Sequence, residues 1–192
     1  GSTNDIILSG PVTASNDSVT LISDFDISDS YATAADIVAG ALYLQAGGSF
    51  GAVGNYIDTN VSTIDDAAAG RNVAGSIYIS EYDDVELGSV NGLTTASGDI
   101  RVEAGVSASG ALTASKVTAG GSGDIYLTTY NTSDIALGYV NALGDDVTLI
   151  SANNITDKDT DGDIDVVADH LYLQAAGYCG TTGTGAAIDT DA

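Results

Sequence analysis

The sequence predicts an all-β fold, a right-handed parallel β-helix (β-solenoid) of about seven to eight coils. Two periods and one compositional bias predict this fold. A four-residue strand core returns along the chain at a nearly constant step, a longer period of 128 residues lies above it, and Glu, Phe, Trp and Met are scarce or absent.

The strand core has Val, Ile or Leu at its first and third positions and Tyr, Thr or Arg at its second. This alternation is typical of a half-buried strand with one face inward. A strand that returns every 22 to 25 residues indicates coils that bury their apolar edges against one another. The cores occupy 19–22, 42–45, 77–80, 100–103, 125–128, 147–150 and 171–174.

Equivalent residues of stacked coils are expected to lie above one another along the axis of the solenoid. We therefore expect the inward third residue of each core to belong to one internal file, which includes Leu44, Ile79, Val102, Leu127 and Leu149.

One step is longer than the others, the 35 residues from Leu42 to Ile77. It predicts a coil that carries a long loop insert at 55–75, and an additional irregular coil over the same residues is the alternative.

The longer period indicates an internal duplication. The segment 19–23 returns as 147–151, and 42–46 returns as 171–175 after one extra residue. The steps between cores from Val19 to Val147 add up to the same 128 residues, so the duplicated unit is expected to be five coils. The chain 1–192 is then one β-solenoid segment of about one and a half units, which we expect to be part of a larger protein.

The composition supports a narrow solenoid and restricts the partners. With 24 Gly, two Phe and no Trp or Met, the core must be built from Val, Ile, Leu and Ala. The formal charge of −23 argues against nucleic acid as a partner and favours divalent cations, although a saline habitat would select the same acidity. Only three of the 27 acidic residues are Glu, and Asp is typical of turns. No apolar stretch is long enough to span a membrane.

One acidic stretch predicts a calcium site. It places carboxylates at alternate positions and Gly162 at the sixth, which is the spacing of the first part of a calcium loop. The bidentate Glu expected at the twelfth position is replaced by Ala168, and a solvated acidic turn is the alternative. The predicted ligands are Asp157, Asp159, Asp161, Asp163 and Asp165.

The second position of the strand cores predicts an outward column of aromatic side chains. Such a column could bind sugar rings or the side of another solenoid, whereas the plainer interpretation is that Tyr and Thr favour strands. The residues of this column are Tyr43, Tyr78, Tyr126 and Tyr172.

Three pairs of neighbouring aspartates, at 65–66, 83–84 and 145–146, are the residues to consider for catalysis. Acid–base hydrolysis of polysaccharides uses paired carboxyl groups that face one groove. Neighbouring residues of a strand point to opposite sides, and no Lys or Arg lies near any pair in the sequence. We therefore expect that the chain is not an enzyme.

The repeats 123–127, 147–155 and 171–175, and the tail 185–190, resemble those of very large bacterial exoproteins, the filamentous-haemagglutinin-like adhesins. The resemblance implies a secreted or cell-surface fibre whose repeat shaft separates an anchor from a binding tip, with no catalytic residues in the shaft. We expect a structural segment that associates end to end through its open edges and possesses a glycan or cell receptor as a further partner. A carbohydrate-binding module and a polysaccharide-degrading enzyme are the alternatives.

Overall fold

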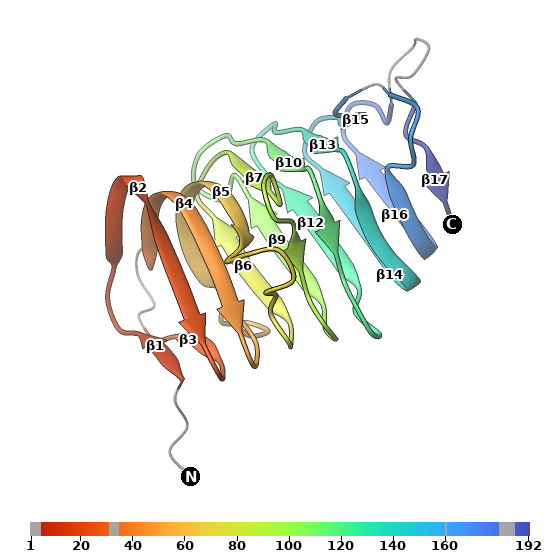
Figure 1. Cartoon of the computed structure of the whole chain (residues 1–192). Helices are drawn as coiled ribbons and strands as arrows, with labels where there is room; N and C mark the ends of the chain where they lie inside the picture. The colour runs from red at the N-terminus through yellow and green to blue at the C-terminus, as the bar shows by residue number, and fades with distance from the viewer. Residues whose placement is uncertain (1–4, 31–34, 160, 181–186) are drawn as a thin grey trace.

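The computed structural model describes residues 5–30, 35–159, 161–180 and 187–192. Within these residues the chain is all strand and turn, wound into a parallel β-solenoid of about 8 turns whose coils succeed one another along a single axis (Figure 1). The all-β solenoid predicted from the sequence is confirmed. The strands are β1 (Ile6–Leu8), β2 (Val12–Ser23), β3 (Ile27–Asp29), β4 (Ile37–Ala46), β5 (Ile57–Asp66), β6 (Ile77–Glu81), β7 (Val85–Leu87), β8 (Leu93–Thr94), β9 (Ile100–Ala104), β10 (Leu112–Ala114), β11 (Val117–Thr118), β12 (Ile125–Thr129), β13 (Ile135–Leu137), β14 (Val140–Ser151), β15 (Ile155–Asp157), β16 (Val166–Ala175) and β17 (Thr190–Asp191).

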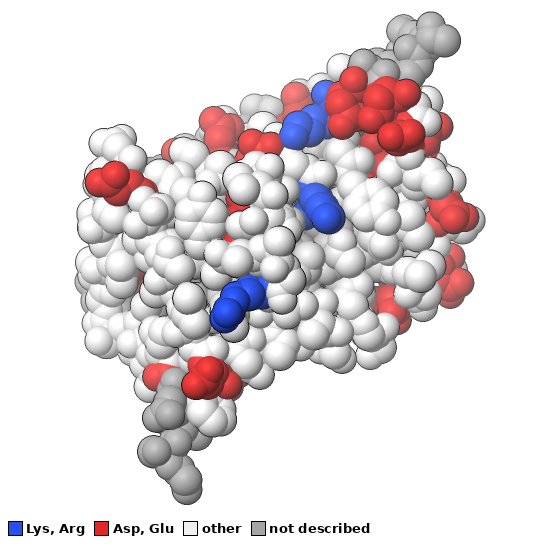
Figure 2. Space-filling model, in the orientation of Figure 1, with Lys and Arg blue, Asp and Glu red and all other residues white. Residues whose placement is uncertain are grey.

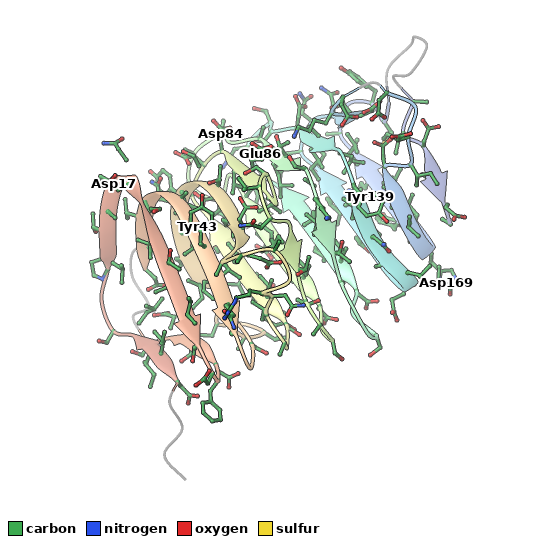
Figure 3. The ribbon with its side chains drawn as sticks, viewed as in Figure 1. Asp17, Tyr43, Asp84, Glu86, Tyr139 and Asp169 are labelled. Carbon is green, nitrogen blue, oxygen red and sulfur yellow. The ribbon has the colours of Figure 1, made fainter. Side chains whose placement is uncertain are left out.

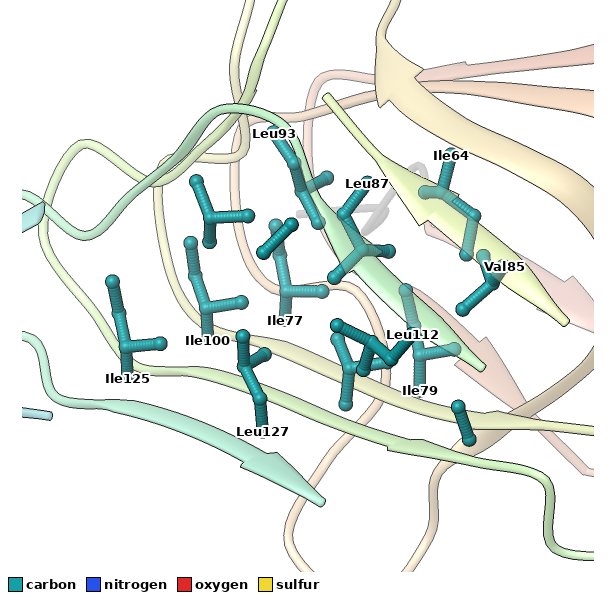
Figure 4. Packing of buried hydrophobic residues seen from close by; sticks show 14 of the residues in the cluster. Ile64, Ile77, Ile79, Val85, Leu87, Leu93, Ile100, Leu112, Ile125 and Leu127 are labelled. Atoms are coloured by element: carbon teal, nitrogen blue, oxygen red, sulfur yellow. The ribbon is translucent and has the colours of Figure 1, made fainter. Parts of the chain in front are cut away.

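The core runs along the inside of the solenoid and consists of Val, Ile, Leu and Ala with one aromatic residue, Phe50 (Figure 4). Alternate residues of each strand point inward, as at Ile77 and Ile79 of β6, which are both fully buried. Because a thin core offers few contacts within one coil, most apolar burial comes from the coils above and below.

In the coils near the two ends, a short strand is followed by a bent strand with two arms, as in β1 and β2 or β13 and β14. In the middle coils the two arms are separate strands, β8 and β9 in one coil and β11 and β12 in the next. In β14 the first arm, 140–142, and the second arm, 146–151, are separated by a shift in register, and β2 has the same shift between Ala14 and Ser18. The short strand and the first arm form one side of the coil, and the second arm forms the other side.

The two sides exchange their roles at β5. On one side, the second arms of β2 and β4 lie beneath β5, and β5 lies beneath the short strand β7. The pairs that show this stacking are Val19↔Leu42, Leu42↔Ile64 and Ile64↔Leu87. On the other side, β6 stacks on the short strands and first arms of the preceding coils. Ile77 of β6 forms a bridge with Phe50, and Ile79 of β6 pairs with Ile57. The part of the solenoid from β6 to the C-terminal end is therefore rotated by about half a coil relative to the part before it.

Because of this rotation, the predicted loop insert and the predicted place of Leu44 are both wrong. The 35-residue step is one and a half coils, so 55–75 is not a loop insert: β5 pairs with coils on both sides and lengthens the step by half a coil, which is nearer to the alternative of an additional irregular coil. Leu44 does not share a file with Ile79, because Leu44 pairs with Asp66. The other four residues do form one file, by the pairs Ile79↔Val102, Val102↔Leu127 and Leu127↔Leu149.

The duplicated unit is five and a half coils rather than five. The residues that stack on Val19 in the five following coils are, in order, Leu42, Ile64, Leu87, Ala114 and Leu137. Val147 comes ten residues later, on the other side, where it stacks on Ile125. The second copy of the repeat is therefore turned by about half a coil about the axis.

Short polar side chains join the coils at the turn before the second arms. Each accepts a backbone N–H of the next coil: Asp124 N donates to Asp99 Oδ1 at 3.1 Å, and Asp146 N donates to Asp124 Oδ1 at 3.1 Å. Ser49 and Ser76 occupy the same position in earlier coils and act alike. A Cβ at Gly123, just before this turn, would lie 2.1 Å from the carbonyl oxygen of Gly98, so the coils approach too closely for a side chain. The expectation that Asp serves the turns is met here.

Removing a side chain from the middle of the internal file should destabilise the protein more than removing one at its end. Leu127 is fully buried between Val102 and Leu149, whereas Leu173, higher in the same file, is only partly buried. We expect Leu127→Ala to lower the free energy of unfolding by about 2–5 kcal/mol, since it leaves a cavity. Leu173→Ala should cost clearly less in the same urea titration. Equal losses would contradict a core whose stability depends on neighbours on both sides.

Candidate functional site

Three of the five predicted calcium ligands meet at the C-terminal end of the solenoid. Asp157 ends β15, Asp165 precedes β16, and Asp159 lies in the turn between these strands; their carboxylate oxygens lie within 4.8 Å of one another. Asp165 is buried, with 2% of its surface exposed, whereas Asp159 is exposed. We call these three residues the C-terminal carboxylate cluster. Figure 2 shows acidic side chains gathered at this end of the molecule.

The other two predicted ligands lie outside the cluster. Asp161 and Asp163 are both exposed, and Asp163 N donates to Asp161 Oδ1 at 2.8 Å, a local turn that occupies the Asp161 carboxylate. Ala168, at the twelfth position of the predicted loop, lies on β16 and is buried in the core of the solenoid. The arrangement is therefore a turn between two strands in which the first, third and ninth positions converge.

The lysine within the acidic stretch does not neutralise the cluster. Lys158 Nζ lies 2.9 Å from Glu86 Oε1 and donates to Ser115 Oγ at 2.5 Å, so it reaches back to residues of β7 and of the turn after β10 (Glu86 is labelled in Figure 3). Ser115 and Lys158 together hold the pKa of Glu86 below its ordinary value. The salt bridge joins separate coils, and it pairs the Lys158 ammonium with Glu86.

Electrostatics within the cluster favour a cation. Burial, and then the nearby carboxylates of Asp157 and Asp189, raise the pKa of Asp165 to about 6, against the hydrogen bond at 2.8 Å that Asp189 N donates to Asp165 Oδ2. Three carboxylates this close repel one another when ionised, and a hard cation with oxygen ligands relieves the repulsion. The cluster can therefore supply part of the coordination shell of calcium.

The outward column is present, but its membership differs from the prediction. Tyr78, Arg101, Tyr126, Thr148 and Tyr172 do stack on one side, through the pairing of β6, β9, β12, β14 and β16. Tyr43 lies on β4 beside Asp65, in a different file, so its inclusion was wrong (Figure 3).

The middle of the column is packed rather than open. Tyr56, which the sequence analysis did not include, lies against Tyr78 with ring centroids 5.8 Å apart. The guanidinium of Arg101 lies 4.2 Å from the ring centroid of Tyr126, a cation–π contact. These contacts leave Tyr78 only 8% exposed, whereas Tyr172, at the open end, is 54% exposed. A sugar ring could reach Tyr172 but not the face of Tyr78.

Three buried carboxylates surround the point where the solenoid rotates. Val61 N lies between the part of β5 that pairs with β6 and the part that pairs with β7, and it donates to Glu81 Oε1 at 3.1 Å. Asp66 accepts bonds from the backbone and the hydroxyl of Thr94, and Asp65 accepts one from Val90 N at 2.9 Å. These groups satisfy backbone donors that the rotation removes from regular pairing.

The pair 65–66, which the sequence offered only as residues to consider for catalysis, has a structural use. Asp65 and Asp66 end β5, and both are buried. Burial raises the pKa of Asp66 and of Glu81 to about 7, more than the hydrogen bonds from Thr94 and Thr59 lower it. A signal was available, because Glu81 stands at an inward position of its strand, two residues after Ile79.

No helix among the described residues has the length and hydrophobicity needed to cross a lipid bilayer. Comparisons of the chain with models of protein families, with curated proteins and with solved structures found no match.

The buried carboxyls predict that stability falls as the pH rises. Glu81 and Asp66 have folded-state pKa values of about 7, above the ordinary values of 4.5 and 3.8. Between these limits the folded protein holds protons that the unfolded chain has released, so this contribution is greatest at the acidic end and is lost as the pH rises through about 7. In chelator at constant ionic strength, the melting temperature should be lower at pH 8 than at pH 5.5.

The variant Glu81→Gln should reduce this pH dependence, because Gln keeps an acceptor for Val61 N but does not titrate in this range. Asp17→Asn, which removes an exposed carboxyl, is the matched control and should leave the slope near that of the wild type. A slope unchanged in Glu81→Gln would show that Glu81 does not carry the effect.

Proposed function

We propose that the chain is a structural segment of a secreted or cell-surface bacterial fibre of the adhesin type, with no catalytic activity of its own. The single observation that carries the proposal is the solenoid itself, in which strand pairing is parallel and runs from one end to the other with a duplicated unit. Such a fold gives length in proportion to the number of coils, and each interface between coils adds to the stability.

The mechanical argument follows from the direction of the hydrogen bonds. Backbone bonds between coils point along the axis, as between Ile100 N and Asp124 O at 2.9 Å and between Ile77 N and Asp99 O at 2.8 Å. Pulling on the two ends loads many such bonds at once, each with a net contribution of about 0.5–1.5 kcal/mol. The side-chain ladder at the turns adds further bonds in the same direction.

Open strands at both ends support association with a second copy. Among the described residues, no strand pairs with β2 on the side away from β4, and β17 covers β16 only at Val166 and Val167. Strands β2 and β16 are bent strands of the same kind, since β2 pairs with β4 as β14 pairs with β16. The β2 edge of one copy therefore matches the β16 edge of another, and unpaired edges of this kind associate readily.

The proposal includes calcium at the C-terminal carboxylate cluster, where an ion would link the end of β15 to the start of β16. A carbohydrate-binding module is the alternative function. It is less well supported, because Tyr43 lies apart from the predicted aromatic platform and Tyr78 is covered.

Blocking the N-terminal edge should weaken self-association. The carbonyl of Ser23 accepts Gly47 N from the next coil, so by alternation the backbone groups of Thr20 point to the open side. Thr20→Pro removes one free N–H from that edge without removing a bond inside the solenoid. Light scattering over a concentration series should show association of the wild type and of Thr20→Val, which keeps the N–H, and weaker association of Thr20→Pro. A wild type that stays monomeric at all concentrations would contradict the proposal.

Calcium should raise the melting temperature through the C-terminal carboxylate cluster. Asp159→Ala removes an exposed ligand of the cluster and should abolish most of the rise between chelator and calcium. The matched control is Asp163→Ala, equally exposed but outside the cluster, which should keep the rise. If both variants lose it equally, the five-residue loop expected from the sequence is the better description, and if the wild type shows no rise, calcium is not bound there.

A further inference from the structure

The first copy of the repeat contains a counterpart of the C-terminal carboxylate cluster. Asp29 ends β3 as Asp157 ends β15, and Asp36 precedes β4 as Asp165 precedes β16. The turns between them differ in sequence, since 158–164 is rich in Asp whereas 30–35 contains no acidic residue. The two aspartates at the strand ends nevertheless occur in both copies.

The buried member of each pair makes the same contact with the next coil. Asp58 N donates to Asp36 Oδ2 at 2.9 Å, and Asp189 N donates to Asp165 Oδ2 at 2.8 Å. Asp36 is fully buried and Asp165 is 2% exposed. Each copy therefore holds one buried carboxylate at the same corner of the coil, fixed through one oxygen.

The second oxygen of Asp36 lacks a donor. Oδ1 is buried and has no hydrogen-bond partner among the described residues. The ionisable groups that act on Asp36 are Asp29, whose carboxyl is within hydrogen-bonding reach, and Asp58, and both are acidic. An unpartnered buried acceptor facing another carboxylate requires either a shared proton or a cation.

A hollow open to the outside reaches Asp29, whereas the fully buried Asp36 lies behind Asp29 and does not line it. It has a volume of about 420 Å³, and Asp29 and Asp58 line it together with Asn55 and Tyr56. Asn55 Nδ2 donates to the backbone carbonyl of Asp29 at 2.9 Å, which holds the wall of the hollow in place. A hydrated ion could therefore approach Asp29 and keep several of its water ligands.

We propose that Asp29 and Asp36, with Asp58 beside them, form a binding site for a divalent cation, at the corner that corresponds to the C-terminal carboxylate cluster of the other copy. Oxygen ligands, incomplete protein coordination and space for water suit calcium, which accepts six to eight oxygens in flexible geometry. The ion would tie β3 and β4 to β5, the strand at which the solenoid rotates. This inference does not depend on the fibre function or on occupancy of the C-terminal carboxylate cluster.

The rotation of the solenoid separates the two sites. Because the repeat spans five and a half coils, the sites lie on different sides of the axis, roughly 26 Å apart along it at roughly 4.8 Å per coil. They should therefore bind independently, and each can be removed without the other.

The test is calcium titration of the whole chain at pH 8 by isothermal calorimetry. We expect Asp36→Asn to lose one bound calcium relative to the wild type, and Asp165→Asn to lose a different one, so that the double variant binds neither. Asp17→Asn, which removes an exposed carboxyl elsewhere, should bind as the wild type does. Because Asn can donate to Asp29 and carries no charge, Asp36→Asn should melt in chelator at or above the wild-type temperature, so loss of binding cannot be attributed to unfolding.

A second measurement uses Tb³⁺, which replaces calcium at oxygen sites and emits when a nearby tyrosine is excited. Tyr56 lines the same hollow, so emission should fall in Asp36→Asn and in Tyr56→Ser. If Asp36→Asn binds as much calcium as the wild type, the proposed site is wrong, even when Asp165→Asn loses an ion. If only Asp36→Asn loses an ion, the site stands and the C-terminal carboxylate cluster does not bind.

Discussion

Parallel pairing of each coil with the next is the interaction on which the rest of this structure depends. An isolated coil of this chain has no interior of its own, because its inward residues are covered only by those above and below. Backbone hydrogen bonds fix the register, and a file such as Ile79, Val102, Leu127 and Leu149 then fills the space inside. Narrow branched side chains suit this arrangement, since a bulky residue in one coil would need a gap in its neighbours.

The half-coil rotation is possible because the two sides of a coil are interchangeable in length. The pairing shows this at β6, where Ile77 bridges Phe50 and Ile79 pairs with Ile57, so one strand covers both parts of the side beneath it. The exchange leaves backbone donors such as Val61 N without a regular partner. Carboxylates of Asp65, Asp66 and Glu81 accept hydrogen bonds there. Burial raises the pKa of Asp66 and of Glu81, so the stability of the junction becomes linked to the protonation of these two groups.

The rotation also determines how the surface repeats. Equivalent residues of the two copies, such as Tyr43 and Tyr172, or Asp36 and Asp165, lie on different sides of the solenoid and cannot form one continuous stripe. A feature repeated in this way suits independent contacts on two sides better than a single long binding groove. The acidic corners, which are built from strand ends and the backbone of the next coil, tolerate this change of side because their supports rotate with them.

The sequence alone determined the all-β solenoid, the inward and outward positions of each strand core, and the duplication, since all of these depend on a local period that neighbouring coils share. It also indicated which aspartates to consider as ligands. Only the tertiary structure decided that 35 residues make one and a half coils, that Leu44 and Tyr43 lie in files apart from Ile79 and Tyr78, and that Asp157, Asp159 and Asp165 converge while Asp161 and Asp163 do not. The physical reason is that the partner of a strand is the strand beneath it in the preceding coil. Both sides of a coil show the same alternation of inward apolar residues, so the sequence does not tell on which side a strand will stack.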